Sequence, residues 1–276
     1  MTGSAPVLFN GLPSDDVLAL SRALHYGDGV FRTLLKHEDV VIDLGRQIDK
    51  LGADAVVLGL APPDGMSLRK DIAAVSHGVP ACVVKVLLMR GGAGRGYRPQ
   101  TDASDRLLLR YPLPQFDDRH WREGIAAIRS QVTMAAQPLL AGIKHLNRLE
   151  QVLASRGWPG GIDEAILADE LGRPVCGTRS NLFWVTRGVL HTPALDRCGV
   201  AGMMRAKLLD LAHRAGREVR VESQSWAALL DAEEAFVCNS LIGIWPLRRL
   251  DERDWSAPRP VTADLMRALA HPTLRA

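Results

Sequence analysis

The stretch "AGIKHLNRLEQ", residues 141–151, places Lys144 directly after small and apolar residues. An amine in a partly apolar pocket near other cations has a lowered pKa, and the neutral amine can form a Schiff base or abstract a proton. His145 and Arg148 could supply that neighbouring positive charge. A solvated lysine at a helix start is the simpler interpretation, although the positive end of a helix dipole does not favour a cation.

The run "CGVAGMMRAKLL", residues 198–209, leads through two glycines into a predicted helix. At such a helix start the backbone N–H groups of Val200, Ala201 and Gly202 would be unpaired, and together they could bind a phosphate. The run is not a nucleotide P-loop, because no G-K-[ST] follows. An ordinary glycine-containing loop before a helix is the alternative.

A second glycine-rich run, "RGGAGRGYRP" at residues 90–99, sets Arg90 and Arg95 among four glycines. A guanidinium matches a carboxylate with two hydrogen bonds, so these arginines could clamp an acidic substrate. A glycine-rich turn without a ligand explains the run equally well.

The composition predicts a globular protein with no nucleic-acid or membrane partner. Of the 276 residues, 47% are hydrophobic and 24% charged, which is enough for a sizeable core in one large domain or two of ordinary size. The net charge of +3 comes from 34 basic and 31 acidic residues, too even a mixture to favour an extended anionic partner. A small anionic ligand stays possible.

The cysteines favour a reducing cytoplasm. They are far apart and lack C-x-x-C spacing, so we expect neither a metal site nor a disulfide framework. The N-terminus has no basic region followed by an apolar stretch, and no window approaches 18 apolar residues. We therefore expect a cytoplasmic protein that does not span a membrane. The cysteines are Cys82, Cys176, Cys198 and Cys238.

The hydrophobic pattern predicts a mixed α/β (α+β) fold in two lobes, residues 1–115 and 116–276, with many antiparallel strands. The boundary lies in the proline-containing, charged stretch 111–124. In the first lobe, period-2 alternation and apolar runs predict two strands around a turn within 29–43 and buried strands at 81–90 and 106–113. The helical spacing there covers residues 46–60 and 67–79.

In the second lobe, apolar residues from Ile143 to Leu153 share one helical face, which predicts a helix that begins close to Lys144 and stops near Gly157. A hairpin should turn at Arg187-Gly188. We expect strands at 163–169, 181–193 and 233–240 and a helix over 203–215.

Several of these segments occur in the order and spacing typical of one enzyme family. The chain resembles the fold-type IV pyridoxal-phosphate enzymes and, among them, the aminodeoxychorismate lyases. "GIKHLNRLEQ" and "RGYR" after a glycine run are the more specific segments, whereas branched-chain and D-amino-acid aminotransferases share "YGDGVF" in variant form. The segments are "HYGDGVFRTLL", "RGGAGRGY", "LAGIKHLNRLEQ", "DEAILAD", "GTRSNLFW", "TPALDRCGVAGMMR" and "AFVCNSLIGIWPL".

The resemblance implies that Lys144 carries pyridoxal 5'-phosphate and later acts as the proton-transfer base, with most of the cofactor site in the second lobe. The cofactor phosphate would bind at Val200 and Ala201, with a hydroxyl from Ser240. The resemblance also implies a homodimer, because the family builds its sites near a subunit interface.

Two positions depart from the family pattern. Lys50 stands where an arginine usually binds the cofactor phosphate, and an ammonium binds phosphate without the bidentate fork. Cys176 stands where a glutamate usually keeps the pyridine nitrogen protonated, and a thiol with a reference pKa near 8.5 does not do so by itself. The cofactor would then be a weaker electron sink, unless an acid such as Glu164 or Asp169 substitutes.

The activity implied is the conversion of 4-amino-4-deoxychorismate to 4-aminobenzoate and pyruvate, a step of folate biosynthesis. A branched-chain or D-amino-acid aminotransferase is the alternative on the same fold, and a cofactor-binding protein without turnover is a third. Because the lyase product is aromatic, elimination should tolerate a weak electron sink better than reversible amino transfer does.

Side chains from three segments are candidates for contacts with the substrate, which has two carboxylates. Arg95 and Tyr97 lie in the glycine-rich run, and Arg106 and Arg148 are further candidate carboxylate partners. The remaining candidates line the cofactor side of the pocket or are packing residues; they are Tyr26 and Thr33.

Overall fold

The computed structural model describes residues 7–13, 20–92, 95–256 and 258–273. The chain forms two compact units. Unit 1 comprises Met1–Gln115 together with Ile143–Asn147, and unit 2 comprises Phe116–Gly142 and Arg148–Ala276. The short segment around Lys144 therefore belongs to unit 1 although it is flanked on both sides by unit 2.

Unit 1 is built on an antiparallel sheet with the order β2-β1-β6-β5-β3-β4 in its described residues. Its central strands β3 and β5 are rich in apolar residues, and most of their side chains are buried. The strands are β1 (Val7–Phe9), β2 (Leu12–Pro13), β3 (Gly29–His37), β4 (Val40–Val41), β5 (Cys82–Arg90) and β6 (Ser104–Tyr111).

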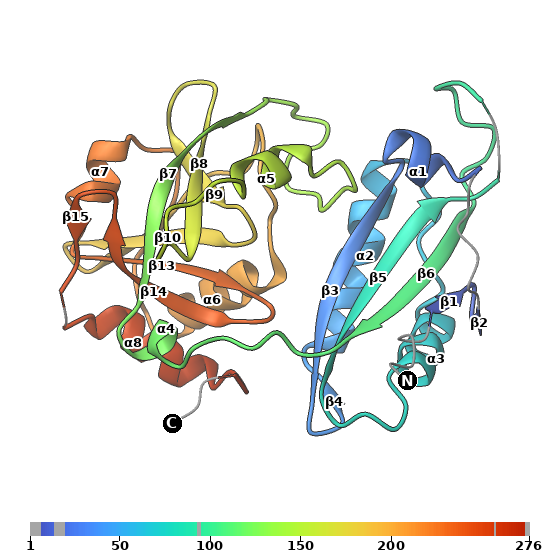
Figure 1. The fold of residues 1–276 in the computed structure, drawn as a ribbon, viewed down its shortest axis with the longest axis horizontal. Coiled ribbons are helices and arrows are strands. Elements are labelled where there is room, and N and C mark those ends of the chain that lie inside the picture. The colour runs from blue at the N-terminus through green and yellow to red at the C-terminus, as the bar shows by residue number, and fades with distance from the viewer. Residues whose placement is uncertain (1–6, 14–19, 93–94, 257, 274–276) are drawn as a thin grey trace. The chain divides into compact units, whose positions relative to one another are not determined.

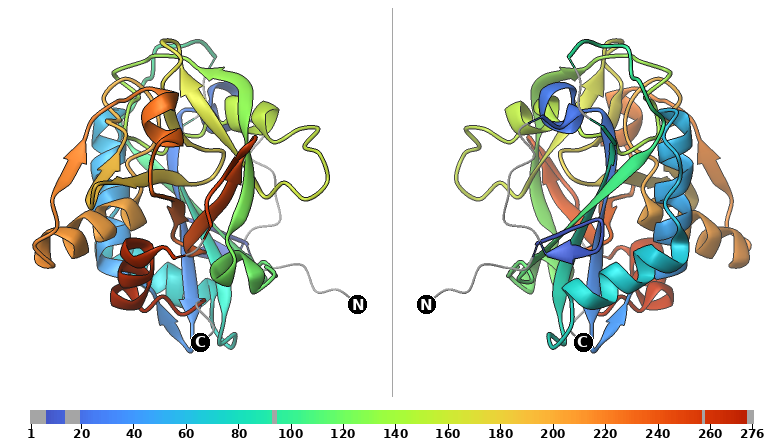
Figure 2. Two further views of the ribbon diagram at one scale, coloured as in Figure 1. Left: turned by 90° about the vertical axis from the view of Figure 1, so that its left-hand side faces the viewer. Right: turned by 90° about the vertical axis from the view of Figure 1, so that its right-hand side faces the viewer.

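Two amphipathic helices cover one face of this sheet (Figures 1 and 2). Helix α2 (Leu44–Val57) buries Ile48, Leu51 and Ala55, whose i, i+3, i+7 spacing forms one stripe. Helix α3 (Gly65–Val75) begins at Asp64, whose carboxylate accepts the Ser67 N–H at 2.8 Å. A short helix, α1 (Arg22–Tyr26), precedes β3.

Unit 2 is a closed barrel with helices outside it. The described strands follow the order β12-β11-β10-β13-β14-β7-β8-β9, and a pairing of β10 with β9 joins β10, β13, β14, β7, β8 and β9 into a ring. The strands are β7 (Ile125–Met134), β8 (Glu164–Asp169), β9 (Pro174–Gly177), β10 (Asn181–Thr186), β11 (Val189–Thr192), β12 (Val219–Val221), β13 (Glu234–Asn239), β14 (Gly243–Leu250) and β15 (Arg253–Asp254). The helices are α4 (Arg119–Arg122), α5 (Leu149–Ala154), α6 (Met203–Arg214), α7 (Trp226–Leu230) and α8 (Pro260–Leu269).

Successive side chains along β10 enter two different core clusters of unit 2. Leu182 and Trp184 belong to the cluster lined by barrel strands, where Trp245 is also fully buried. Phe183 and Val185 point the other way, into a cluster that includes apolar residues of α6 and α8. Two helices therefore cover the outside of the barrel, and Figure 1 shows both beside its strands.

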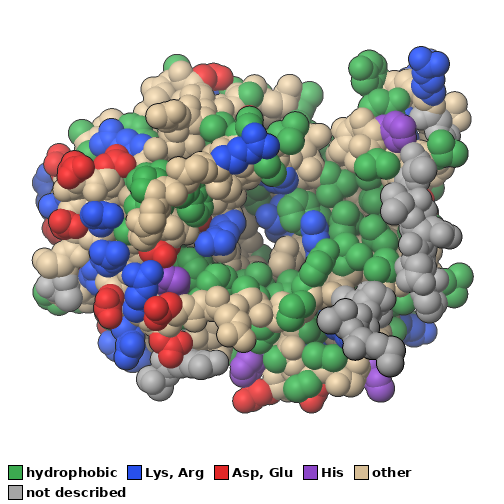
Figure 3. Space-filling model, viewed as in Figure 1, with side chains coloured by type: hydrophobic (Ala, Val, Ile, Leu, Met, Phe, Trp, Pro, Cys, Tyr) green, Lys and Arg blue, Asp and Glu red, His purple; other side chains and the backbone are tan. Residues whose placement is uncertain are grey.

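The predicted mixed α/β class and its main strands are confirmed. The hairpin turns at Arg187 and Gly188, which have φ values of 50° and 74°, as a two-residue turn of this kind requires. Figure 3 shows Lys/Arg and Asp/Glu side chains interspersed over unit 2 on the face in view. In the described part of the chain, no helix is long and apolar enough to cross a lipid bilayer.

Candidate functional site

The Lys144 segment pairs with β3 of unit 1 through an isolated β-bridge and two backbone hydrogen bonds, so the predicted start of a helix close to Lys144 is wrong. The Phe31 N–H donates to the Lys144 carbonyl at 2.9 Å, and the Leu146 N–H donates to the Gly29 carbonyl at 2.9 Å. Val30 and His145 pair as an antiparallel bridge. Because β3 takes up these backbone groups, the helix α5 starts only at Leu149.

The side chain of Lys144 lies over an aromatic ring. Its Nζ is 4.5 Å from the centroid of Phe31, and Lys85 Nζ lies 5.0 Å from the same centroid. Thr33 is two residues further along β3, so it shares the face of Phe31 and is half-buried. Lys144 is thus presented beside apolar surface, as its sequence context indicated.

Close backbone packing holds this segment against β3. A Cβ atom on Gly29 would lie 2.6 Å from the Leu88 carbonyl oxygen and 2.9 Å from Leu146 Cδ1. A Cβ on Gly27 would collide with the Asn147 amide, and Gly27 also has a φ of 65°. Both glycines of "YGDG" therefore serve the approach of residues 146 and 147.

We expect Gly29→Ala to lower the free energy of unfolding by about 1–3 kcal/mol, because the methyl group must displace β5 or Leu146. Denaturant titration of the purified protein measures this. Gly52→Ala is the matched control: its nearest neighbour, Pro62 Cβ, is at 3.6 Å, and alanine in the helix α2 should stabilise by ~0.5–1 kcal/mol. Equal stabilities for Gly29→Ala and the wild type would contradict the close approach of Leu146.

A buried carboxylate that the sequence patterns did not single out lies at the Lys144 backbone. Asp54, on α2, is fully buried and accepts the Lys144 N–H at 3.2 Å. It also forms ion pairs with Arg32 on β3 and with Lys50 one turn earlier on α2. Burial lowers the pKa of Arg32, and Asp54 opposes that change. The i, i+4 spacing of Lys50 and Asp54 was the available sequence signal.

Arg90 is committed to the fold, which speaks against its expected part in a substrate clamp. Its Nε donates to Asp28 at 2.9 Å, and its Nη atoms donate to Asp102 and to backbone carbonyls. Arg22 shares the Asp28 carboxylate and donates to the carbonyls of Gly96 and Tyr97. These bonds fix the described end of the glycine-rich run; residues 93 and 94 lie outside the described residues.

The candidate substrate residues of unit 1 differ in their surroundings. Tyr97 is 87% exposed and Arg95 is exposed, while the Tyr26 hydroxyl accepts the Gly96 N–H at 3.0 Å and its ring meets that of Tyr97 edge-on. Arg106 pairs with Asp71 at 2.9 Å, which makes it the weaker candidate. The assignments of Tyr26, Thr33, Arg95, Tyr97 and Arg106 stay predictions.

The α6 N-terminus in unit 2 is shaped by close contacts. Asn181 Nδ2 donates to the Val200 carbonyl at 2.7 Å, and a Cβ on Gly202, the N-cap residue, would collide with the same Asn181 side chain. The Ala201 N–H donates to the Gly142 carbonyl at 3.0 Å. The expectation that this N–H is unpaired is therefore wrong.

Other groups near the start of α6 carry positive charge or polar atoms. Arg205, in the first turn, is 8% exposed and donates to Thr192 Oγ1 and the Pro193 carbonyl. Burial lowers its pKa. Ser240 follows β13, and its carbonyl oxygen lies 3.2 Å from His271 Nε2. The phosphate role of Val200, Ala201 and Ser240 stays a prediction.

Cys176 lies in β9 and is buried among apolar and sulfur-containing side chains. Its Sγ is 3.6 Å from Met134 Sδ, and Cys198 belongs to the same cluster. Burial raises the pKa of the Cys176 thiol to about 12, with further contributions from Cys198 and Glu164. The thiol is therefore neutral near pH 7. Burial also lowers the pKa of Arg148, which Cys176 and Glu150 oppose.

Glu164 and Asp169, the two acids that could substitute for a glutamate at position 176, already accept hydrogen bonds from nearby turns. Glu164 accepts hydrogen bonds from the Thr178 N–H at 3.0 Å, from its hydroxyl at 2.5 Å and from the Ser180 hydroxyl at 2.8 Å. Asp169 binds the guanidinium of Arg173 and two N–H groups of the turn between β8 and β9. Both carboxylates thus stabilise local structure.

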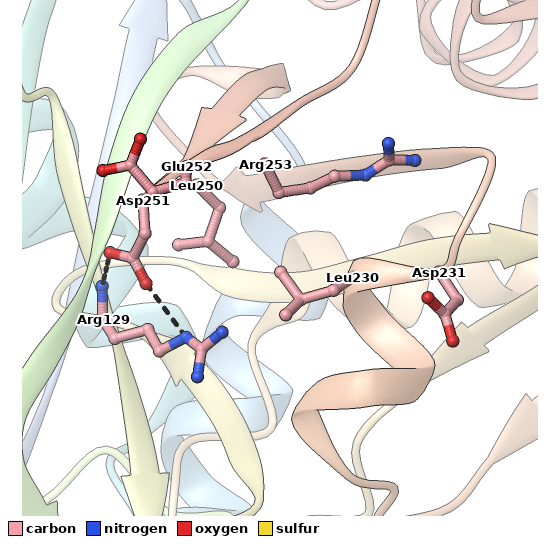
Figure 4. A pocket seen from close by; sticks show the side chains of 7 residues that line it. All are labelled: Arg129, Leu230, Asp231, Leu250, Asp251, Glu252 and Arg253. Carbon is pink, nitrogen blue, oxygen red and sulfur yellow. Dashed lines mark hydrogen bonds and ion pairs between the residues drawn. The ribbon is translucent and has the colours of Figure 1, made fainter.

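A pocket of about 590 Å³ in unit 2 involves none of the predicted site residues (Figure 4). An ion pair between Arg129 and Asp251, with Nε and Oδ2 2.9 Å apart, occupies one side of it. Its rim is formed by the turn between β14 and β15 and by the end of α7. The lining residues are Arg129, Leu230, Asp231, Leu250, Asp251, Glu252 and Arg253.

Comparison with known proteins assigns the family. Residues 29–250 match the model of the class IV amino-transferases, which is most of the chain. The chain belongs to the class IV aminotransferase family. The predicted resemblance to the fold-type IV pyridoxal-phosphate enzymes is thereby confirmed, and members of this family bind pyridoxal phosphate.

Relatives within the class IV aminotransferase family include lyases and aminotransferases. An aminodeoxychorismate lyase from Vibrio harveyi is 31% identical over 240 residues, covering 86% of this chain and 89% of that protein. The crystal structure of 4-amino-4-deoxychorismate lyase from Pseudomonas aeruginosa superposes with a TM-score of 0.91 at 38% identity, covering 98% of this chain and 100% of that one. The structure of a branched-chain amino acid aminotransferase from Escherichia coli has a TM-score of 0.85 at 25% identity, with 98% and 94% coverage.

Proposed function

We propose that this protein is a pyridoxal-phosphate-dependent carbon–oxygen lyase that converts 4-amino-4-deoxychorismate to 4-aminobenzoate and pyruvate for folate biosynthesis. The observation that carries the proposal is the 38% identity to the Pseudomonas aeruginosa lyase across 98% of this chain. The Vibrio harveyi lyase, at 31% identity, supports the same substrate. The Escherichia coli aminotransferase is less similar, at 25% identity.

The chain's residues suit two parts of the cofactor. Lys144 offers an amine beside the Phe31 ring, where an aldehyde can be bound covalently. The start of α6 offers a glycine N-cap that leaves no room for a side chain, and the buried cation of Arg205 in the first turn favours an anion. When bound, the cofactor supplies an electron sink for the carbon that carries the substrate amine.

In this proposal Lys144 removes the proton from the amine-bearing carbon of the substrate, the neighbouring ring carbon–oxygen bond breaks, and the released enolate takes up a proton to become pyruvate. Arg95 and Arg148 bind the substrate carboxylates, since guanidinium groups pair with carboxylates through two hydrogen bonds. Tyr97 adds an aromatic surface. Tyr26 holds the loop that carries Tyr97, because its hydroxyl accepts the Gly96 N–H. Lys50 binds the cofactor phosphate while it is paired with Asp54.

Cys176, the residue expected at the ring nitrogen, does not fit a protonated pyridine. With its pKa raised to about 12 by burial, the Cys176 thiol carries no negative charge that would hold a proton on that nitrogen. A cofactor with an unprotonated ring withdraws electrons less strongly. This favours elimination over amino transfer, because the aromatic product supplies driving force of its own.

A homodimer in the cytoplasm completes the proposal. On α5, Leu149, Val152 and Leu153 are 75%, 47% and 49% exposed, and such exposed apolar groups are suited to a partner surface. The alternative activity, a branched-chain or D-amino-acid aminotransferase, has its support in the family assignment.

The decisive assay measures 4-aminobenzoate and pyruvate together, from aminodeoxychorismate and the purified protein loaded with pyridoxal phosphate. We expect the two products in equal amounts. A parallel assay with branched-chain or D-amino acids and 2-oxoglutarate should give no glutamate above background. Glutamate without 4-aminobenzoate would support the aminotransferase, and a loaded protein that forms neither product would be a cofactor-binding protein without turnover.

A further inference from the structure

We propose that Asp54 holds the backbone of Lys144 in place, and that Arg32 and Lys50 are the counter-ions of Asp54. The inference rests on the proposed role of Lys144. Asp54 contacts the backbone of that lysine directly, through the 3.2 Å hydrogen bond from its N–H. Asp54 belongs to α2, which is distant in sequence from Lys144 but lies in the same unit.

The hydrogen bond fills a gap in the pairing of the Lys144 segment with β3. The carbonyl of Lys144 and the N–H of Leu146 are both bonded to β3. The N–H of Lys144 is instead bonded to the Asp54 carboxylate, which thereby fixes the lysine from the helical side of the sheet. An N–H bonded to a carboxylate is held more strongly than one bonded to a neutral carbonyl.

The charges around Asp54 explain why a carboxylate is stable in this place. Asp54 has no exposed surface, and Arg32 is 3% exposed, so each compensates the other's burial. Lys50 adds a second cation, with its side chain 29% exposed. These three side chains together carry a net charge of +1. Without Asp54, Arg32 and Lys50 would both lose this counter-ion.

One consequence follows for Lys144. Its backbone should be held more firmly than the pairing with β3 alone allows. Lys50, in turn, reaches the phosphate only with its charge partly neutralised by Asp54.

The test compares two full-length variants, Arg32→Met and Arg32→Met/Asp54→Leu, so that no buried arginine is left without its anion. Hydrogen exchange of the Lys144 amide is measured in the cofactor-free protein, with the Leu146 amide as internal reference. We expect the second variant to exchange the Lys144 amide at least ~10-fold faster than the first, as loss of a charge-assisted bond implies, with Leu146 unchanged. Equal exchange, or equal acceleration at both amides, would overturn the proposal.

The matched control is a second aspartate–arginine pair between a helix and a strand of unit 1. Asp71 on α3 pairs with Arg106 on β6 at 2.9 Å. Comparing Arg106→Met with Arg106→Met/Asp71→Leu should leave exchange at Lys144 unchanged. None of these readouts needs turnover, so they would stand even if the lyase assay failed.

Discussion

Replacing Lys144 by alanine is expected to abolish formation of 4-aminobenzoate, with kcat/KM lower by at least ~10³-fold. Loss of a covalent nucleophile that also transfers a proton removes two contributions to the rate at once. Quenched-flow or chromatographic assay of the product measures the loss. The same variant should give no covalently labelled peptide when the cofactor-loaded protein is treated with borohydride.

Lys85→Ala is the matched control for this change, because Lys85 Nζ lies over the same Phe31 ring at 5.0 Å. It removes an equal charge from nearly the same place in unit 1 and should keep both turnover and the borohydride-labelled peptide. If Lys144→Ala retained turnover, or if Lys85→Ala lost the label, Lys144 would not be the lysine that carries the cofactor.

Replacing Cys176 by glutamate is expected to raise the rate of amino transfer to an oxo acid by at least about tenfold, equivalent to about 1.4 kcal/mol in the barrier. The added carboxylate would hold a proton on the ring nitrogen and strengthen the electron sink. Lyase turnover should change much less, because aromatisation drives that reaction. Both rates are measured on one preparation, with Cys176→Gln as the uncharged control of the same shape.

This variant also has an expected pH dependence of stability. The burial that raises the pKa of the Cys176 thiol to about 12 should raise the pKa of a glutamate there as well. The folded state would then bind the proton more tightly than the unfolded state, so stability falls as pH rises through the usual range of a glutamate, from about 4 upward. Denaturant titrations of the cofactor-free protein at pH 5 and 7.5 should show this fall in Cys176→Glu but not in Cys176→Gln. A larger rise in lyase turnover than in amino transfer would contradict our account of Cys176.

Strands were the part of the fold that sequence patterns predicted well, because a short apolar run between polar turns is a local property. The segment around Lys144 failed for the opposite reason. Ile143, Leu146 and Leu149 have helical spacing, yet the first two lie in the segment that bridges to β3, where this pairing decides the conformation. Leu149 and the two apolar residues after it do form α5, but they are largely exposed. Tertiary pairing thus overrode the local period.

Sequence patterns can single out a candidate residue whose type carries its chemistry, but not a residue whose role depends on its partners in the fold. Lys144 was singled out as a candidate from its neighbours in sequence, and its role stays a prediction. By contrast, the sequence around Arg90 suggests a substrate clamp, whereas in the fold Arg90 forms ion pairs with Asp28 and Asp102. Asp54 is an ordinary helical aspartate in sequence, and only the fold brings it to Arg32 and Lys144.

The discontinuous make-up of unit 1 has a consequence for its synthesis. The first 115 residues leave the ribosome before the segment that completes their sheet, and residue 147 follows 32 positions later. At a synthesis rate of ~5–20 residues per second, the edge of β3 that residues 144–146 later cover stays exposed for roughly 2–6 s. An uncovered strand edge can pair with another chain. Nascent chains arrested in this interval should therefore need chaperone protection that chains released past residue 147 do not.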